Sequence, residues 1–199
     1  MKLSTSLWVA AGTVVPPALL VATALGPLGT TSQDFDMPGT QPGGLNVDIE
    51  ASNRCDSCHG FYDEAIEPHS AWAGGMMAQA MRDPIFHATL AIAEQDAPGS
   101  GNLCLRCHSP KGWLEGRATP TDGSALVGKD FEGANCNFCH RMVDPVFDAN
   151  ENPAVDAAIL ASLAQAPEGS HSGQFVIDPE DRRRGPFDLG NNFWWHEWE

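Results

Sequence analysis

Basic residues are scarce in this chain of 199 residues: 11 Lys and Arg stand against 26 Asp and Glu, which gives a formal net charge of −15. Nucleic-acid binding needs a basic footprint, so the composition argues against that class of function. An acidic surface instead favours fast, salt-sensitive encounter with a basic partner protein.

Strand patterns are also scarce, whereas helix signals recur. Ser70 precedes "AWAGGMMAQAMRD" as a candidate N-cap, and Pro84 opens "PIFHATLAIAEQD" at a first-turn position. Residues 96–102 break the pattern, and a third helix is expected from Asn152 to just before Pro167. The sequence therefore predicts a mainly α, loop-rich protein with little strand.

No cysteine lies outside one repeated pattern, C-x-x-C-H, so none is left over for a disulfide. The pattern occurs three times: as motif 1, "CDSCH" (Cys55, Cys58, His59), as motif 2, "CLRCH" (Cys104, Cys107, His108), and as motif 3, "CNFCH" (Cys136, Cys139, His140). The sequence between the motifs is not repeated, which excludes a tandem array of identical modules.

The three motifs are typical of covalent haem c attachment, in which two cysteines form thioether bonds to the haem vinyl groups and the histidine is the proximal iron ligand. Zinc is an alternative, but it usually takes four Cys or His ligands from two such pairs, so a third motif would lack a partner. A thioredoxin-like dithiol is another alternative, but it leaves three histidines unexplained. We therefore expect three haem c groups that form much of the hydrophobic core, and a haem-free chain that does not fold.

An arginine accompanies every motif: Arg54 precedes motif 1, Arg106 lies inside motif 2 and Arg141 follows motif 3. Guanidinium groups pair well with carboxylates, so these residues are candidates for binding haem propionates, the alternative being ordinary solvated charge. The basic run "DRRRGPF" at residues 181–187 is too short to indicate nucleic acid. It is expected either to bind a propionate or to pair with Asp and Glu of the same chain.

From about residue 42 to residue 187 the chain resembles the bacterial multihaem c-type cytochrome family. The resemblance rests on the three motifs and on "WAGGMMAQA" at residues 72–80, which is similar to a family helix whose histidine ligates a haem from the distal side. Met77 stands where that histidine would be, and a methionine thioether is an accepted axial ligand that raises the haem potential. Because family members commonly continue into further haem motifs, the resemblance also implies a short version or an amino-terminal portion.

Three histidines outside the motifs are further candidates for distal iron ligands. His69 lies at a helix entrance, His171 follows the third predicted helix, and His196 lies among aromatic residues in "FWWHEWE". A surface or capping role is the alternative for each. What fills these distal positions separates an electron carrier from a catalyst.

Residues 1–30 combine Lys2 with a long uncharged apolar run, which is typical of a cleaved secretory signal peptide. A retained membrane anchor is the alternative, because the uncharged run exceeds the roughly 20 residues that a helix needs to span a bilayer. Residues 31–53 are expected to form a Gly- and Pro-rich linker that wraps or tethers, and residues 54–199 a trihaem cytochrome c domain. Both alternatives predict a periplasmic or other extracytoplasmic protein.

These observations favour electron transfer through three covalently bound haems, with redox partner proteins that include a basic soluble carrier, a membrane oxidoreductase or a photosynthetic complex. A catalytic multihaem oxidoreductase acting on a small nitrogen or sulfur compound is an alternative, although no sequence constellation demands it. A protomer of an extracellular haem filament is another. The sequence does not predict the oligomeric state.

Overall fold

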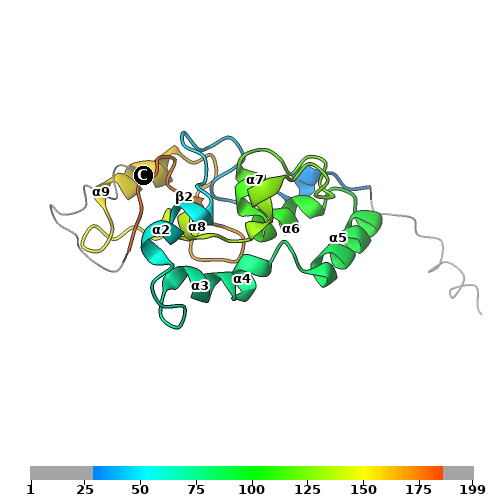
Figure 1. Cartoon of the computed structure of the whole chain (residues 1–199). Helices are drawn as coiled ribbons and strands as arrows, with labels where there is room; N and C mark the ends of the chain where they lie inside the picture. The colour runs from blue at the N-terminus through cyan, green and yellow to red at the C-terminus, as the bar shows by residue number, and fades with distance from the viewer. Residues whose placement is uncertain (1–28, 186–199) are drawn as a thin grey trace, which may run out of the picture.

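The computed structural model describes residues 29–185. Of these residues, 42% are helical and 3% are in strands, which confirms the mainly helical, loop-rich class with little strand (Figure 1). The elements follow one another as η1 (Ser32–Phe35), η2 (Ser52–Arg54), α2 (Asp56–His59), α3 (Pro68–Ala73), α4 (Met76–Gln79), α5 (Pro84–Asp96), α6 (Gly101–His108), α7 (Pro110–Leu114), η3 (Gly128–Glu132), α8 (Cys136–His140), β1 (Met142–Val143), α9 (Ala154–Ser162) and β2 (Val176–Ile177).

The main core lies where α5, α6, α7 and α8 meet. Its buried members include Phe86 and Leu90 of α5, Leu105 of α6, Trp113 of α7 and Phe138 of α8. Burial of each large apolar side chain contributes roughly 1.5–3 kcal/mol. Because Leu105 and Phe138 lie between the two cysteines of motifs 2 and 3, the core holds both motifs in place.

A smaller core lies between α9 and a two-stranded ribbon. Strand β1 pairs with β2 in antiparallel fashion, with Met142 opposite Ile177 and Val143 opposite Val176. Val143 and Val176 pack with Ile159 of α9. The ribbon therefore joins the segment just after motif 3 to residues far along the chain.

The Gly- and Pro-rich segment at residues 31–53 packs along the domain. Backbone hydrogen bonds join Thr40 to Phe175, Gly43 to Leu114 and Asn46 to Pro179. Ile49, near the end of the segment, is a buried member of the main core. The segment thus wraps around the body of the protein up to the start of motif 1.

The predicted helix bounds need correction at three places. The helix expected after Ser70 is two short helices, α3 and α4, and α3 begins at Pro68 with Glu67 as its N-cap residue. Gly74 and Gly75 interrupt it because glycine loses more backbone entropy in a helix than other residues.

The other two corrections are smaller. Helix α5 has the predicted bounds and is capped by the Asp83 side chain. The break predicted over residues 96–102 ends earlier than expected, because α6 begins at Gly101 and Asn102 is therefore helical. Helix α9 ends at Ser162, several residues before Pro167.

Among residues 29–185, no helix is long and apolar enough to cross a membrane. Residues 1–28 of the predicted signal peptide or anchor, and His196, lie outside the described residues.

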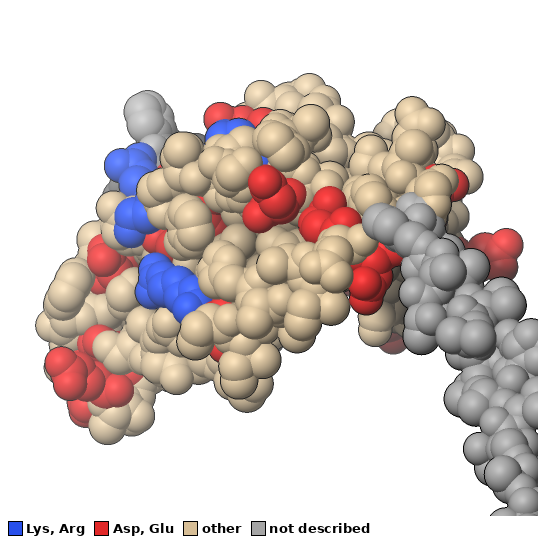
Figure 2. All heavy atoms as spheres, turned by 90° about the vertical axis from the view of Figure 1, so that its right-hand side faces the viewer, with Lys and Arg blue, Asp and Glu red and all other residues tan. Residues whose placement is uncertain are grey.

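Figure 2 shows the end of the molecule formed by η1, α5 and α6 as a largely uncharged surface with scattered acidic groups and few basic ones.

Candidate functional site

Each C-x-x-C-H motif forms a short turn of helix whose last residue is the histidine. Motif 1 begins at the N-cap of α2, motif 2 ends α6, and motif 3 forms the whole of α8. Positions i, i+3 and i+4 of a helix lie on one face. The two cysteines and the histidine of each motif therefore share a face.

The residues between the cysteines form the opposite face in motifs 2 and 3. Leu105 and Arg106 are buried in motif 2, as are Asn137 and Phe138 in motif 3. By contrast, the second cysteine of every motif is exposed: Cys58, Cys107 and Cys139. Motifs 2 and 3 are thus fixed by their inner residues and present their second cysteines outward.

No disulfide joins any of the six cysteines, all of which lie within the described residues. Burial raises the pKa of the Cys104 thiol, which keeps it protonated at neutral pH. A hydrogen bond with Cys55 lowers the pKa of Cys136. This contact brings the first cysteines of motifs 1 and 3 together.

Two further sets of contacts hold motif 1 against motif 3. The Glu50 N–H donates to Asn137 Oδ1 at 3.1 Å, and Asn135 Nδ2 donates to the Glu50 carbonyl at 2.8 Å. The Ser52 N–H donates to Glu132 Oε2 at 2.9 Å. The chain that leads into motif 1 is therefore bonded to residues within or just before motif 3.

The histidine of motif 2 is held by two contacts. Its Nδ1 lies 2.9 Å from the carbonyl oxygen of Ala80, at the end of α4. The Phe86 ring stacks on the imidazole with a centroid distance of 3.7 Å and an interplanar angle of 8°. The Ala80 bond makes Nδ1 the protonated nitrogen of His108 and leaves Nε2 as the nitrogen with a lone pair for a metal.

The histidine of motif 3 has the same kind of contact. Nδ1 of His140 lies 2.7 Å from the carbonyl oxygen of Arg184, and the Arg184 N–H donates to the His140 carbonyl at 2.6 Å. The same ring nitrogen is therefore bonded to a backbone carbonyl in both motifs. The sequence carries no signal for the stacking of Phe86 on His108, and sequence analysis did not predict it. Sequence analysis identified the basic run that contains Arg184, but not the bond from His140 to the Arg184 carbonyl.

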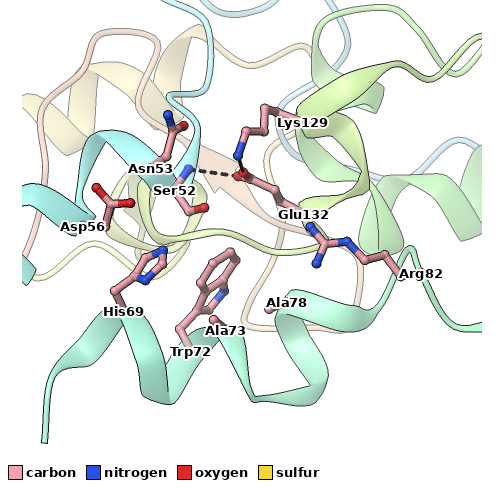
Figure 3. Close-up of a pocket in the computed structure, with 10 residues that line it drawn as sticks. All are labelled: Ser52, Asn53, Asp56, His69, Trp72, Ala73, Ala78, Arg82, Lys129 and Glu132. Atoms are coloured by element: carbon pink, nitrogen blue, oxygen red, sulfur yellow. Dashed lines mark hydrogen bonds and ion pairs between the residues drawn. The ribbon is translucent and has the colours of Figure 1, made fainter. Parts of the chain in front are cut away.

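A cavity of about 240 Å³ lies beside motif 1. His69 and Trp72 rise into it from α3 and face Ser52 and Asp56, while Glu132 lies between Ser52 and Lys129 (Figure 3). The Trp72 indole N–H donates to the Ala134 carbonyl at 2.8 Å, which fixes α3 against the start of motif 3. The structure therefore brings His69, a predicted distal ligand, close to motif 1.

The other described distal candidates lie near motifs 2 and 3. Met77 is on α4, its side chain is exposed, and its carbonyl accepts the Ala134 N–H at 3.1 Å just before motif 3. Gly133 allows this approach because its φ is +69° and a Cβ would clash with that carbonyl. His171 is exposed in the loop that contains Gly173, and a Cβ on Gly173 would lie 3.9 Å from the Cys107 sulfur.

The three arginines beside the motifs differ in their surroundings. Arg54 is largely exposed and pairs with Glu50 at 3.3 Å. Arg106 is buried between the Trp113 and Phe175 rings, at 4.4 and 4.5 Å, and donates to the carbonyls of Gly173 and Pro38. Burial lowers the pKa of Arg106 to about 10, so it stays charged at neutral pH.

Arg141 is fully buried and directs its guanidinium at protein acceptors. It donates to the carbonyls of Val47 and Asp48 at 3.0 Å each, to the Asp178 carbonyl from two nitrogens, and to Asn137 Oδ1. Arg106 and Arg141 thus have structural partners already, and propionate binding stays a prediction for all three arginines.

The basic run pairs with carboxylates of the same chain, one of its two predicted roles. Arg182 binds Asp178, Arg183 binds Asp181, and Arg184 binds both Asp178 and Asp156.

Within the part of the chain that the structure describes, no three His, Cys, Asp or Glu side chains form a group that could hold a metal ion. No known family model, curated protein or solved structure matches the chain.

Proposed function

We propose that this protein transfers electrons by means of three covalently attached c-type haems, one at each C-x-x-C-H motif. The observation that carries the proposal is the shared geometry of motifs 2 and 3. In both, the cysteines and the histidine lie on one helical face, and Nδ1 is bonded to a backbone carbonyl, so that Nε2 is the available ligand nitrogen. A thioredoxin-like dithiol gives no reason for this arrangement of the histidines. A zinc ion would suit such a histidine as well, but zinc usually takes four Cys or His ligands from two such motifs, so the third motif would lack a partner.

Exposed apolar side chains next to the motifs support the proposal. The exposed groups lie just after motif 1, just before motif 2 and just after motif 3: Phe61, Tyr62, Ile66, Leu103, Met142, Val146 and Phe147. Phe61 also has a positive φ of 64°, which is uncommon for a residue with a side chain, while its side chain is 82% exposed. A porphyrin at each motif would cover such groups.

In this proposal each residue type has a distinct role. Cys55, Cys58, Cys104, Cys107, Cys136 and Cys139 would hold the haems through thioether bonds, and His59, His108 and His140 would ligate the irons. Bound in this way, haem supplies reversible one-electron chemistry between ferric and ferrous iron. The protein contributes fixed imidazole orientation through the Ala80 and Arg184 carbonyls, and close spacing of motifs 1 and 3 through the bonds of Glu50 with Asn135 and Asn137.

Met77, His69 and His171 are our candidates for the distal positions, with His69 assigned to motif 1 because it lines the adjacent cavity. Mixed methionine and histidine ligation would separate the potentials of the haems and set the direction of electron flow. The net charge of −15 supports a basic redox partner. We place the protein outside the cytoplasm, where haem c is attached, either free or tethered to a membrane oxidoreductase or photosynthetic complex.

Mass spectrometry of the intact protein tests the proposal. The chain, produced in a host that attaches haem c, should weigh more than its polypeptide by three haems, and Cys104→Ser/Cys107→Ser should remove one of them. A redox titration followed by visible absorption should then resolve one-electron transitions. A protein that weighs no more than its amino acids, or that releases its pigment into acid acetone, would overturn the proposal.

A further inference from the structure

His140 ends α8 at the surface, and its side chain is exposed. An exposed imidazole has rotamer freedom unless a partner holds it. Its hydrogen-bond partner is Arg184, far along the chain, which accepts from Nδ1 through its carbonyl at 2.7 Å and donates its N–H to the His140 carbonyl at 2.6 Å. The orientation of the ring therefore depends on where the backbone of Arg184 lies.

The Arg184 side chain holds that backbone in place. Its guanidinium binds the Asp156 carboxylate of α9 through two nitrogens, and Asp178 Oδ2 at 2.9 Å. Asp156 and Asp178 are 1% and 0% exposed.

Two buried carboxylates make this connection rigid. A buried carboxylate without its cation is strongly unfavourable, so Asp156 and Arg184 stay together in the folded protein. A guanidinium that forms several bonds in one plane also fixes the direction of the chain that carries it. The connection thus runs from α9 and the end of β2, through Arg184, to the imidazole of motif 3.

We propose that Arg184 is a positioning residue for His140: its ion pairs with Asp156 and Asp178 hold its carbonyl where it orients the imidazole as an iron ligand. The inference rests on the proposed function, because it concerns the haem of motif 3. A ligand histidine whose other nitrogen donates to a carbonyl is more basic and has a fixed ring orientation. Loss of that restraint makes the imidazole a weaker donor and favours ferrous iron.

The effect is specific to one motif because motif 2 uses different partners. His108 is oriented by the Ala80 carbonyl and the Phe86 ring, and neither group contacts Arg184 in the interactions described above. A change in the Arg184 network should therefore alter one haem and leave the haem of motif 2 unaffected.

The test uses the complete haem-bearing protein and the variant Asp156→Leu/Arg184→Met. Replacing both members of a buried ion pair by apolar residues is often neutral for stability, whereas removing Arg184 alone would leave Asp156 without its cation. Arg182→Met is the matched control, because Arg182 lies in the same run and also binds Asp178. In this control Asp178 still has Arg184 as its partner. Arg184→Lys restores the charge without the planar geometry.

We expect the double variant to keep three haems by mass and to raise the midpoint potential of one haem. Loss of an outer-shell partner typically changes metal affinity by about 10-fold or more. If the affinity of the imidazole for ferric iron falls tenfold relative to that for ferrous iron, the midpoint potential rises by about 59 mV for one electron. The low-spin ferric resonance of that haem should broaden, because its imidazole takes a range of orientations. Arg184→Lys should give a smaller shift, and Arg182→Met none.

The outcomes separate this inference from the function on which it rests. Three haems with unchanged potentials and resonances in the double variant would overturn the role of Arg184 and leave electron transfer intact. Equal shifts in the double variant and in Arg182→Met would also overturn it, because a change that spares Arg184 would then act as strongly as its removal. If the double variant loses a haem, Arg184→Lys is compared with Arg182→Met by midpoint potential and ferric resonance. A shift in Arg184→Lys alone supports the role of Arg184, and equal results for the two variants overturn it. A parent protein without haem would instead refute the proposed function.

Discussion

Replacing Arg141 by leucine should destabilise the protein far more than the same replacement at Arg54, although sequence analysis treated the two alike. Arg141 is 0% exposed and joins three backbone carbonyls, those of Val47, Asp48 and Asp178. Arg54 is exposed at the surface and pairs only with Glu50 among the partners described above. The contrast therefore tests whether the arginine beside motif 3 is a structural residue.

The magnitude follows from what each carbonyl loses. Asp178 is fully buried, so its carbonyl would be left without a partner at a cost of about 1–3 kcal/mol. Water can reach the carbonyls of Val47 and Asp48 more easily, and each loses roughly 0.5–1.5 kcal/mol. The expected total is about 2–6 kcal/mol, a large part of the roughly 5–15 kcal/mol that stabilises a domain. The Arg54 pair should contribute about 0–1 kcal/mol.

Urea denaturation of the protein, produced in a host that attaches haem c and followed by circular dichroism, measures both values. We expect Arg141→Leu to lower the midpoint clearly, Arg141→Lys to lower it by less, and Arg54→Leu to leave it nearly unchanged. Redox titration of the same variants supplies the second readout. If Arg141→Leu kept the parent stability but shifted a haem potential, the structural argument would be wrong and propionate binding would be favoured.

Three further predictions concern other parts of the molecule. Phe86→Leu should cost less than about 1.5 kcal/mol in stability, since it nearly conserves volume. It should nevertheless alter the redox transition of one haem, because the His108 ring loses its stacking partner. Unchanged transitions in a redox titration would contradict this role. Burial alone would raise the pKa of Glu132, but hydrogen bonds from Lys129 and the Ser52 N–H lower it below its usual value. The stabilisation by the Glu132 carboxylate is therefore complete above pH about 4.3, the unfolded pKa, and decreases as the pH falls through the lowered pKa of the folded protein. Glu132→Gln and the parent should differ in urea midpoint at neutral pH and converge in acid. An equal difference at both pH values would show that the charge is irrelevant. Finally, the chain produced without haem attachment should lack a cooperative unfolding transition in calorimetry, and a sharp transition like that of the haem-bearing protein would show that the polypeptide core suffices.

The sequence by itself predicted the features that depend on local spacing. Helix α5 has the predicted bounds because Pro84 and the break after Asp96 act within a few residues of the helix ends. The cysteines and histidine of each motif share a face because a helical turn relates positions three and four apart. The paired glycines after Ala73 carried a local signal as well, and giving them their helix propensity would have separated α3 from α4.

Only the tertiary structure decided what surrounds the motifs. His108 is bonded to Ala80 and His140 to Arg184, and both contacts join residues far apart in the chain, which no local pattern encodes. The same holds for the arginines: Arg54 and Arg141 have identical side chains, but packing buries one and leaves the other at the surface. Local sequence thus predicts where a cofactor would be attached, whereas long-range packing determines which groups hold the motif histidines, because burial and hydrogen-bond partners depend on segments that meet only in the folded chain.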